Sequence, residues 1–203
     1  MSGTVGGPVI GSRGTGVIGG KKFYRFTSGT SVLYIPEFAS MVAIECVGSG
    51  GAGGGGGCGS VPDGGGGGGG GSIARIRVPT EGLGETLTIT IPSVAAGGAG
   101  GTGNSVPGVD GASGGSVTVT DDDTSKVILT AFGGGGGDGS NAVNNAGAAG
   151  GGGGGTGGVG EVGSGNTGGN GGEPYIEGST QGDSLGGRGA KGGNNDTDGD
   201  SAE

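Results

Sequence analysis

The sequence has no histidine and no tryptophan, and only two of its 203 residues are cysteines. Without histidine a Ser/His or Cys/His nucleophile pair cannot form, and Cys46 and Cys58 alone cannot make a usual zinc site. We expect one thiol buried in a strand and one in a loop, and a disulfide closing the first glycine-rich loop is the alternative. The sequence predicts no catalytic, cofactor-binding or metal-binding residue, and therefore a protein that is not an enzyme.

Basic and aromatic residues are also scarce. There are 9 Lys and Arg against 18 Asp and Glu, and aromatic residues make up 3% of the chain. A nucleic-acid-binding protein usually has a basic face or interleaved stacking aromatics, so we expect no nucleic-acid partner. No stretch approaches the ~20 apolar residues of a membrane span, so we expect no membrane partner. The first seven residues lack the charged start and apolar run of a secretory signal, which disfavours an exported host protein.

Glycine dominates what is present, with 67 residues. Val, Ile, Leu and Phe together supply under a fifth of the chain, a level typical of disorder when the net charge is -9. These apolar residues are clustered, however, in 23–47, 73–91 and 117–132. One modest core can therefore form beside long segments that bury little.

Alternating apolar and polar residues with many β-branched side chains predict seven strands. Their ranges are 22–27, 31–35, 41–47, 73–78, 85–91, 117–119 and 127–132. No window has a helical apolar period, so the fold class is all-β, a small antiparallel β-sandwich with long glycine-rich insertions. Same-face positions predict one core made of Val42, Ile44, Leu87, Ile89, Val127 and Leu129.

The chain divides into four regions. Residues 1–20 read as an extended N-terminal leader, and residues 21–132 as a β-domain interrupted by glycine-rich insertions at 48–71 and 97–115. A glycine-rich segment follows at 133–172, and a polar acidic tail closes the chain at 173–203.

The glycine-rich regions show a three-residue repeat. The glycines in phase are 97, 100 and 103; 108, 111 and 114; 154, 157, 160 and 163; 165, 168 and 171; and 186, 189 and 192. Three residues per turn is the period of a polyproline-II-type helix, and only glycine lets several such backbones pack closely. Seven prolines are too few for collagen. Two interpretations stay open, packed polyglycine-II helices and mobile glycine loops over a β-domain.

Three acidic patterns were weighed as sites. Asp121, Asp122 and Asp123 fall in an expected hairpin turn, where solvation explains them. Residues 194–200 match the first part of an EF-hand loop, but the position-twelve Glu would fall beyond the last residue and no helices flank it. Residues 133–138 resemble one calcium β-roll repeat without its large apolar residue. We therefore predict no specific calcium site.

The order of segments resembles a known family. Phe-Tyr-Arg-Phe-Thr-Ser-Gly-Thr from residue 23 precedes an apolar strand and Pro36, and Val-Ala-Ile-Glu-Cys-Val from residue 42 runs into glycines. A basic strand, a Thr/Ile strand and Ile-Leu-Thr-Ala-Phe followed by glycines from residue 133 complete the order. This order resembles the glycine-rich domain of phage tail-fibre and other virion proteins over residues 22–160. It is more distantly similar to T-even-type tail-fibre tip adhesins, which present variable loops on a glycine-helix bundle.

The resemblance implies a bacteriophage virion protein, in a tail fibre or other host-contacting appendage. Adhesin loops are usually aromatic, whereas 48–71, 97–115 and 133–172 hold no aromatic residue, so the primary prediction is a structural role. Three alternatives remain: a receptor-binding tip adhesin, a capsid decoration or head fibre, and a host cell-surface glycine-rich protein. The expected partners are other virion proteins, a host receptor for the adhesin, and further copies of the chain, with a trimer as the usual fibre arrangement.

Overall fold

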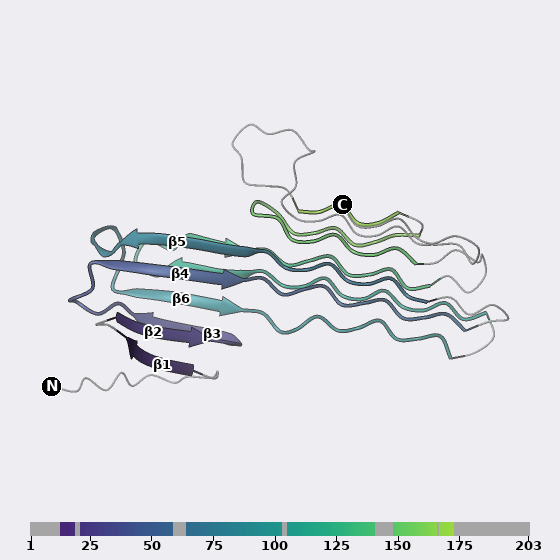
Figure 1. Cartoon of the computed structure of the whole chain (residues 1–203), viewed down its shortest axis with the longest axis horizontal. Helices are drawn as coiled ribbons and strands as arrows, with labels where there is room; N and C mark the ends of the chain where they lie inside the picture. Colours follow the sequence, from purple (N-terminus) through teal and green to yellow (C-terminus); the bar gives the residue numbers. More distant parts are fainter. Residues whose placement is uncertain are drawn as a thin grey trace.

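A computed structural model describes residues 13–18, 21–58, 64–102, 105–140, 148–165 and 167–172, with the backbone alone at 13–18 and 21. The predicted tail at 173–203 and most of the predicted leader lie outside these residues. A β-domain occupies one end of the molecule, and long glycine-rich segments extend from it roughly along the strand direction (Figure 1).

Eight strands make up the described β-domain. They are β1 (Arg13–Ile18), β2 (Lys21–Phe26), β3 (Gly29–Tyr34), β4 (Met41–Val47), β5 (Ile73–Pro79), β6 (Thr86–Ile91), β7 (Val117–Asp121) and β8 (Lys126–Ala131). A single 3-10 turn, η1 (Thr80–Gly82), joins β5 to β6, and no α-helix occurs in the described residues. The predicted all-β class is confirmed, and each predicted strand has its counterpart.

The strands pair antiparallel in three sheets. The largest has the order β3-β6-β7-β8, and β4-β5 and β1-β2 are two-stranded. The β4-β5 ribbon contacts β7 and β8. Two antiparallel layers therefore face each other, as the sequence predicts.

The core lies between these layers. Leu87, Val119 and Ala131 are at most 1% exposed, and Ile89, Val117 and Cys46 are also buried. Val42 and Ile44 pack against them from β4. Each alternate residue of β6 and β7 points inward because successive strand side chains face opposite sides. This alternation, not overall apolar content, supplies the core.

One predicted core residue is wrong. Val127 is 51% exposed and does not pack in the cluster. The pairing register shifts at this point: Val119 pairs with Leu129 but Thr120 pairs with Val127, so Ile128 is an extra residue. A β-bulge of one residue reverses the facing of what lies beyond it, and Ile128 packs against the core instead.

The leader contains a strand that the sequence pattern did not predict. Arg13–Ile18 pairs with all of β2, from Arg13 opposite Phe26 to Ile18 opposite Lys21. The hairpin lies at the lower edge of the β-domain in Figure 1. The strand was missed because Arg-Gly-Thr-Gly-Val-Ile has no alternation of apolar and polar residues.

Candidate functional site

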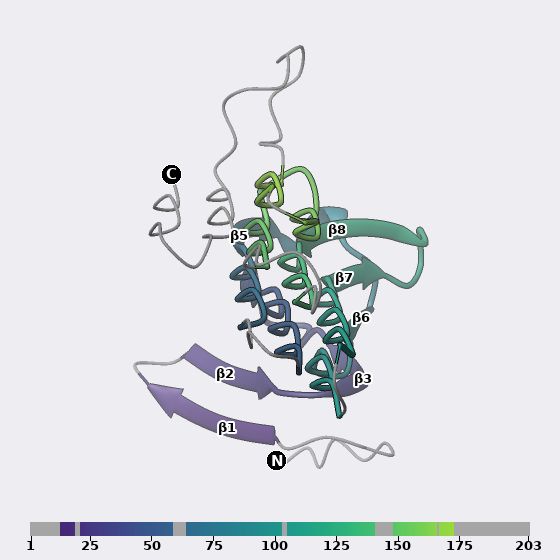
Figure 2. The ribbon, with the colours of Figure 1, turned by 90° about the vertical axis from the view of Figure 1, so that its right-hand side faces the viewer.

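The glycine-rich segments form straight arms that continue the strands. We number them arm 1 (48–58), arm 2 (64–72), arm 3 (92–102), arm 4 (105–116), arm 5 (132–140), arm 6 (148–155), arm 7 (159–163) and arm 8 (167–172). Viewed along the bundle, they appear as small coils packed side by side (Figure 2). Arms 1 to 5 join directly to β4, β5, β6, β7 and β8 (Figure 1).

Hydrogen bonds between arms repeat every third residue. The N–H groups of Ser49, Ala52, Gly55 and Cys58 in arm 1 donate to the carbonyls of Gly115, Ala112, Val109 and Val106 in arm 4, at 2.8–3.1 Å. The residues just before three of these also follow the three-residue step. The N–H groups of Gly48, Gly51 and Gly54 donate to the carbonyls of Ser72, Gly69 and Gly66 in arm 2, each at 2.8 Å. A three-residue period with bonds only between neighbours is that of packed polyglycine-II helices. Of the two interpretations left open by the sequence, the structure therefore has packed polyglycine-II helices and not mobile glycine loops.

Arm 5 is the centre of the bundle. It donates to arms 1 and 6 and accepts from arms 2, 4 and 7, and residues 133–137 are all buried. For example, Gly137 donates to Ala52 at 2.9 Å while its carbonyl accepts from Gly111 at 2.8 Å. A backbone buried without side chains is stable only because its polar groups are paired in this way.

Steric exclusion explains the glycines. A Cβ at Gly51, Gly54 or Gly135 would overlap a backbone carbonyl of the neighbouring arm. The predicted row of glycines at 108, 111 and 114 is confirmed as the packed one, because a Cβ on each would overlap a carbonyl of arm 1. Gly154, Gly160 and Gly163 are likewise tightly packed.

Three parts of the predicted phase are wrong. In arm 3 the packed glycines are Gly98 and Gly101, one residue later than 97 and 100. In arm 8 the buried, tightly packed glycines are Gly169 and Gly172, whereas 168 and 171 are half-buried. Gly157 is exposed in the turn where Gly155 donates to the carbonyl of Gly158. In these arms more than one residue of each triplet is glycine, so the sequence does not reveal which one faces inward. The remaining glycines of the predicted rows, at 103 and at 186, 189 and 192, lie outside the described residues.

Several outward-facing positions of the arms carry larger side chains. Val109 is 58% and Val162 43% exposed, and Asp110 and Glu161 are exposed too. The Glu161 carboxylate accepts a hydrogen bond from Asn170 Nδ2 at 2.7 Å. These larger side chains therefore lie at positions that face away from the neighbouring arms.

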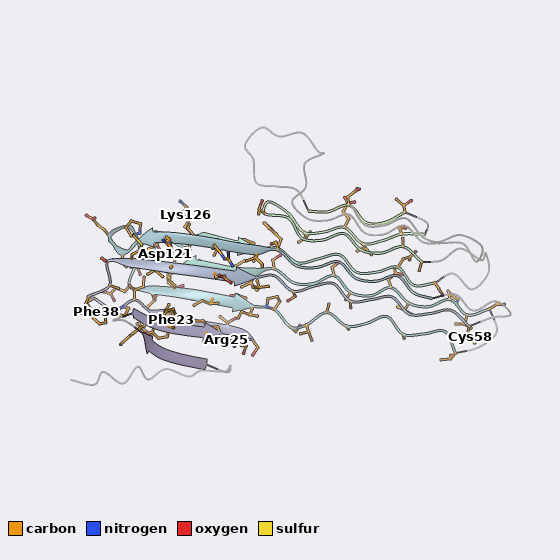
Figure 3. The ribbon with its side chains drawn as sticks, in the orientation of Figure 1. Phe23, Arg25, Phe38, Cys58, Asp121 and Lys126 are labelled. Atoms are coloured by element: carbon orange, nitrogen blue, oxygen red, sulfur yellow. The ribbon has the colours of Figure 1, made fainter. Side chains whose placement is uncertain are left out.

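Asp121, the first of the three aspartates in the β7–β8 turn, has a structural role. Asp121 is 2% exposed, which corrects the prediction that this turn is solvated. Its Oδ1 accepts the N–H groups of Gly84 and Asp123, each at 3.2 Å, and its Oδ2 accepts the Thr124 hydroxyl at 2.9 Å. Gly84 must be glycine, because a Cβ there would lie 2.6 Å from Asp121 Oδ1. The carboxylate thus ties the β7–β8 turn to the 83–86 loop at the end of the β-domain away from the arms (Figure 3).

Two carboxylates, Asp110 in arm 4 and Asp138 in arm 5, lie side by side where these arms meet. Burial, and then a hydrogen bond with Asp110, raise the pKa of Asp138. Gly139 N–H donates to Asp110 Oδ1 at 2.8 Å, and Gly165 N–H donates to Asp138 Oδ2. The sequence did not reveal this pair, because the glycine repeat does not show which residues of arms 4 and 5 lie opposite each other.

Both cysteines are free thiols, so the disulfide alternative is wrong. Cys46 is buried in β4, where burial and then the charge of Glu45 raise the pKa of its thiol. Cys58 ends arm 1 at the far end of the bundle (Figure 3). Twelve residues at ~3.1 Å each separate them by far more than a disulfide can bridge.

Within the described ranges, no three His, Cys, Asp or Glu residues come together as a metal site. Residues 133–138 lie in arm 5, and the EF-hand-like residues 194–200 lie outside the described ranges. The part of the chain that the structure covers contains no helix able to cross a membrane.

No curated protein and no solved structure matches the chain. A family model described as a glycine-rich domain does match, over residues 26–203. That range covers the β-domain from the end of β2 onward and every arm of the bundle. The chain therefore belongs to the glycine-rich domain family.

Proposed function

We propose that the chain is a structural protein of a bacteriophage particle, in a tail fibre or another appendage that contacts the host. The observation that carries the proposal is the central arm 5, buried and hydrogen-bonded to five neighbouring arms. A lattice bonded on every side resists bending, which suits a projection that transmits force to a cell surface. The similarity of the segment order to virion glycine-rich domains supports the same location.

Purified virions test this proposal directly. An antibody or gold label on the chain should locate it by electron microscopy at a fibre or appendage, in a fixed number of copies. Labelling on the capsid would support the head-fibre alternative. Virions that lack the chain entirely would refute the proposal.

A receptor-binding tip adhesin is the second candidate, because the far ends of the arms lie together. Cys58 pairs with Val106 through both backbone bonds, and Ser140 contacts Gly55 and Gly108. The connections 59–63, 103–104 and 141–147 therefore begin and end at one end of the bundle. If the chain is an adhesin, the purified protein should compete with phage for adsorption to host cells. A purely structural component should not.

A further inference from the structure

One face of the bundle consists of exposed glycines, most of which the packing does not require. It lies on arms 1, 2 and 3, on the side away from arm 5, and we call it the glycine face. In arm 1, Gly48, Gly51 and Gly54 turn toward arm 5, which leaves Gly50 and Gly53 outside. The members of the face are Gly50, Gly53, Gly64, Gly67, Gly70, Gly97 and Gly100, all exposed.

A side chain would fit at the members of the face in arms 2 and 3, whereas a Cβ at Gly50 or Gly53 in arm 1 would lie 3.3 Å from a carbonyl oxygen of arm 2. Added Cβ atoms at Gly64, Gly67 and Gly70 would meet nothing within 4 Å, and at Gly97 the nearest atom would be 3.9 Å away. Glycine loses more chain entropy on folding than any other residue, so it destabilises an open position compared with alanine. Outward positions on other arms carry side chains, such as Val109 and Glu161. Within the described bundle, the exposed glycines of arms 2 and 3 on this face therefore have no steric explanation.

Arms 1 and 2 also have unpaired backbone donors in the three-residue step of the lattice. Among the described residues, the N–H groups of Gly50 and Gly53 in arm 1 and of Gly65 and Gly68 in arm 2 have no acceptor. These are the groups that would bond to one more arm placed beside arms 1 and 2. A helix bound there must itself have glycine at every third position, because any Cβ in that row would overlap a carbonyl.

We propose that residues 186–193 of this chain bind to the glycine face as a further three-residue helix beside arms 1 and 2. They lie outside the described residues and read Gly-Gly-Arg-Gly-Ala-Lys-Gly-Gly. At three residues per turn, Gly186, Gly189 and Gly192 form one row and Arg188 and Lys191 another. The first row meets the bundle and the basic row faces water.

The length of chain before this segment permits the contact. Arm 8 ends at Gly172, and thirteen residues separate it from Gly186. At up to ~3.3–3.6 Å per residue they reach about 45 Å, against about 34 Å for the length of arm 1 at ~3.1 Å per residue. The family match also continues through these residues to 203.

Amide hydrogen exchange on the full chain tests the proposal. Gly53, Gly65 and Gly68 should exchange about 100-fold more slowly than unstructured glycines, because a bonded amide exchanges only when its helix opens. A Gly189→Val and Gly192→Val double variant should lose that protection, since the Cβ atoms keep the segment away. The matched Arg188→Val and Lys191→Val double variant should retain it. Gly137, which donates to Ala52 within the bundle, should stay protected in all three proteins and shows that each is folded.

Three outcomes would overturn the proposal. Fast exchange of Gly65 and Gly68 in the unaltered chain would mean that the glycine face is free. Protection that disappears on dilution, together with dimers in sedimentation, would identify a second copy as the occupant. Protection that survives Gly189→Val and Gly192→Val would assign the face to another segment.

Discussion

Adding one methyl group to the central arm tests the bundle most directly. A Cβ at Gly135 would overlap the Glu161 carbonyl of arm 7. Relieving the overlap requires arm 7 to move by roughly 1 Å, which breaks bonds that are now near ideal length. Two such bonds hold arm 7 on arm 5: Gly160 to Gly133 and Gly163 to Gly136, each 3.0 Å.

The loss can be estimated from those bonds. At about 1–2 kcal/mol for each buried bond, Gly135→Ala costs about 2–4 kcal/mol. The lower entropy of the unfolded alanine chain returns about 0.4–1 kcal/mol. The net loss of about 1–3.6 kcal/mol should speed exchange of the Gly137 amide by about 5- to 450-fold.

Gly64→Ala is the matched control, because a Cβ there meets nothing within 4 Å. It should leave the Gly137 amide unchanged, or slow its exchange by a few-fold. If the two variants differ by less than about 0.5 kcal/mol, the arms are not packed as described and the steric argument fails.

The remaining predictions concern the β-domain and the carboxylates. Leu87→Ala should lower the free energy of unfolding in urea by ~2–5 kcal/mol because Leu87 is 1% exposed, whereas Val127→Ala on the outer side of the bulge should change it by less than ~0.5 kcal/mol. Asp121→Ala should cost ~2–4 kcal/mol, because it leaves two backbone N–H groups and a hydroxyl without their acceptor; a loss under ~1 kcal/mol would mean that water replaces the carboxylate. The raised pKa of Asp138 means that the folded chain binds this proton more tightly, so its contribution to stability grows as pH falls through that pKa and is absent above it. Urea titrations of Asp138→Asn at acidic and neutral pH should lack this gain, and Asp110→Asn should reduce it; an unchanged pH dependence would contradict the pairing.

The β-domain could be predicted because its strands carry a two-residue pattern over a buried face. β6 reads Thr-Leu-Thr-Ile-Thr-Ile, and its Leu87 and Ile89 are buried as the alternation requires. The exceptions are places where the pattern has no physical basis. β1 has no apolar alternation to read, and the extra residue Ile128 reverses the facing of Val127 without altering the composition.

The period of the glycine arms was readable, but their phase was readable only where side chains interrupt the glycines. In arm 4 the residues between Gly108, Gly111 and Gly114 are not glycine, so the inward row is unambiguous. Residues 64–71 are eight consecutive glycines, which fit any phase equally. The expected hairpin brings arms 4 and 5 side by side, but which of their residues lie opposite each other is not encoded locally, and for this reason the Asp110–Asp138 contact could not be predicted.

The sheets themselves supply the missing register. In β4 and β5 Val47 is opposite Ile73, and the next bond along joins Gly48 to Ser72, followed by 51 to 69 and 54 to 66. In β7 and β8 Val117 is opposite Ala131, and the pairs 114 with 134, 111 with 137 and 108 with 140 continue the same register into arms 4 and 5. A glycine helix cannot fix its own alignment, since every turn is alike and no side chain marks it. Strands that are held in register by a two-layer core can do so, and the spacing between paired strands, about 4.8 Å, also lets glycine backbones hydrogen-bond side by side. The β-domain therefore acts as the template that aligns the glycine arms, and a mutation that shifts its register should misalign the bundle without touching a glycine.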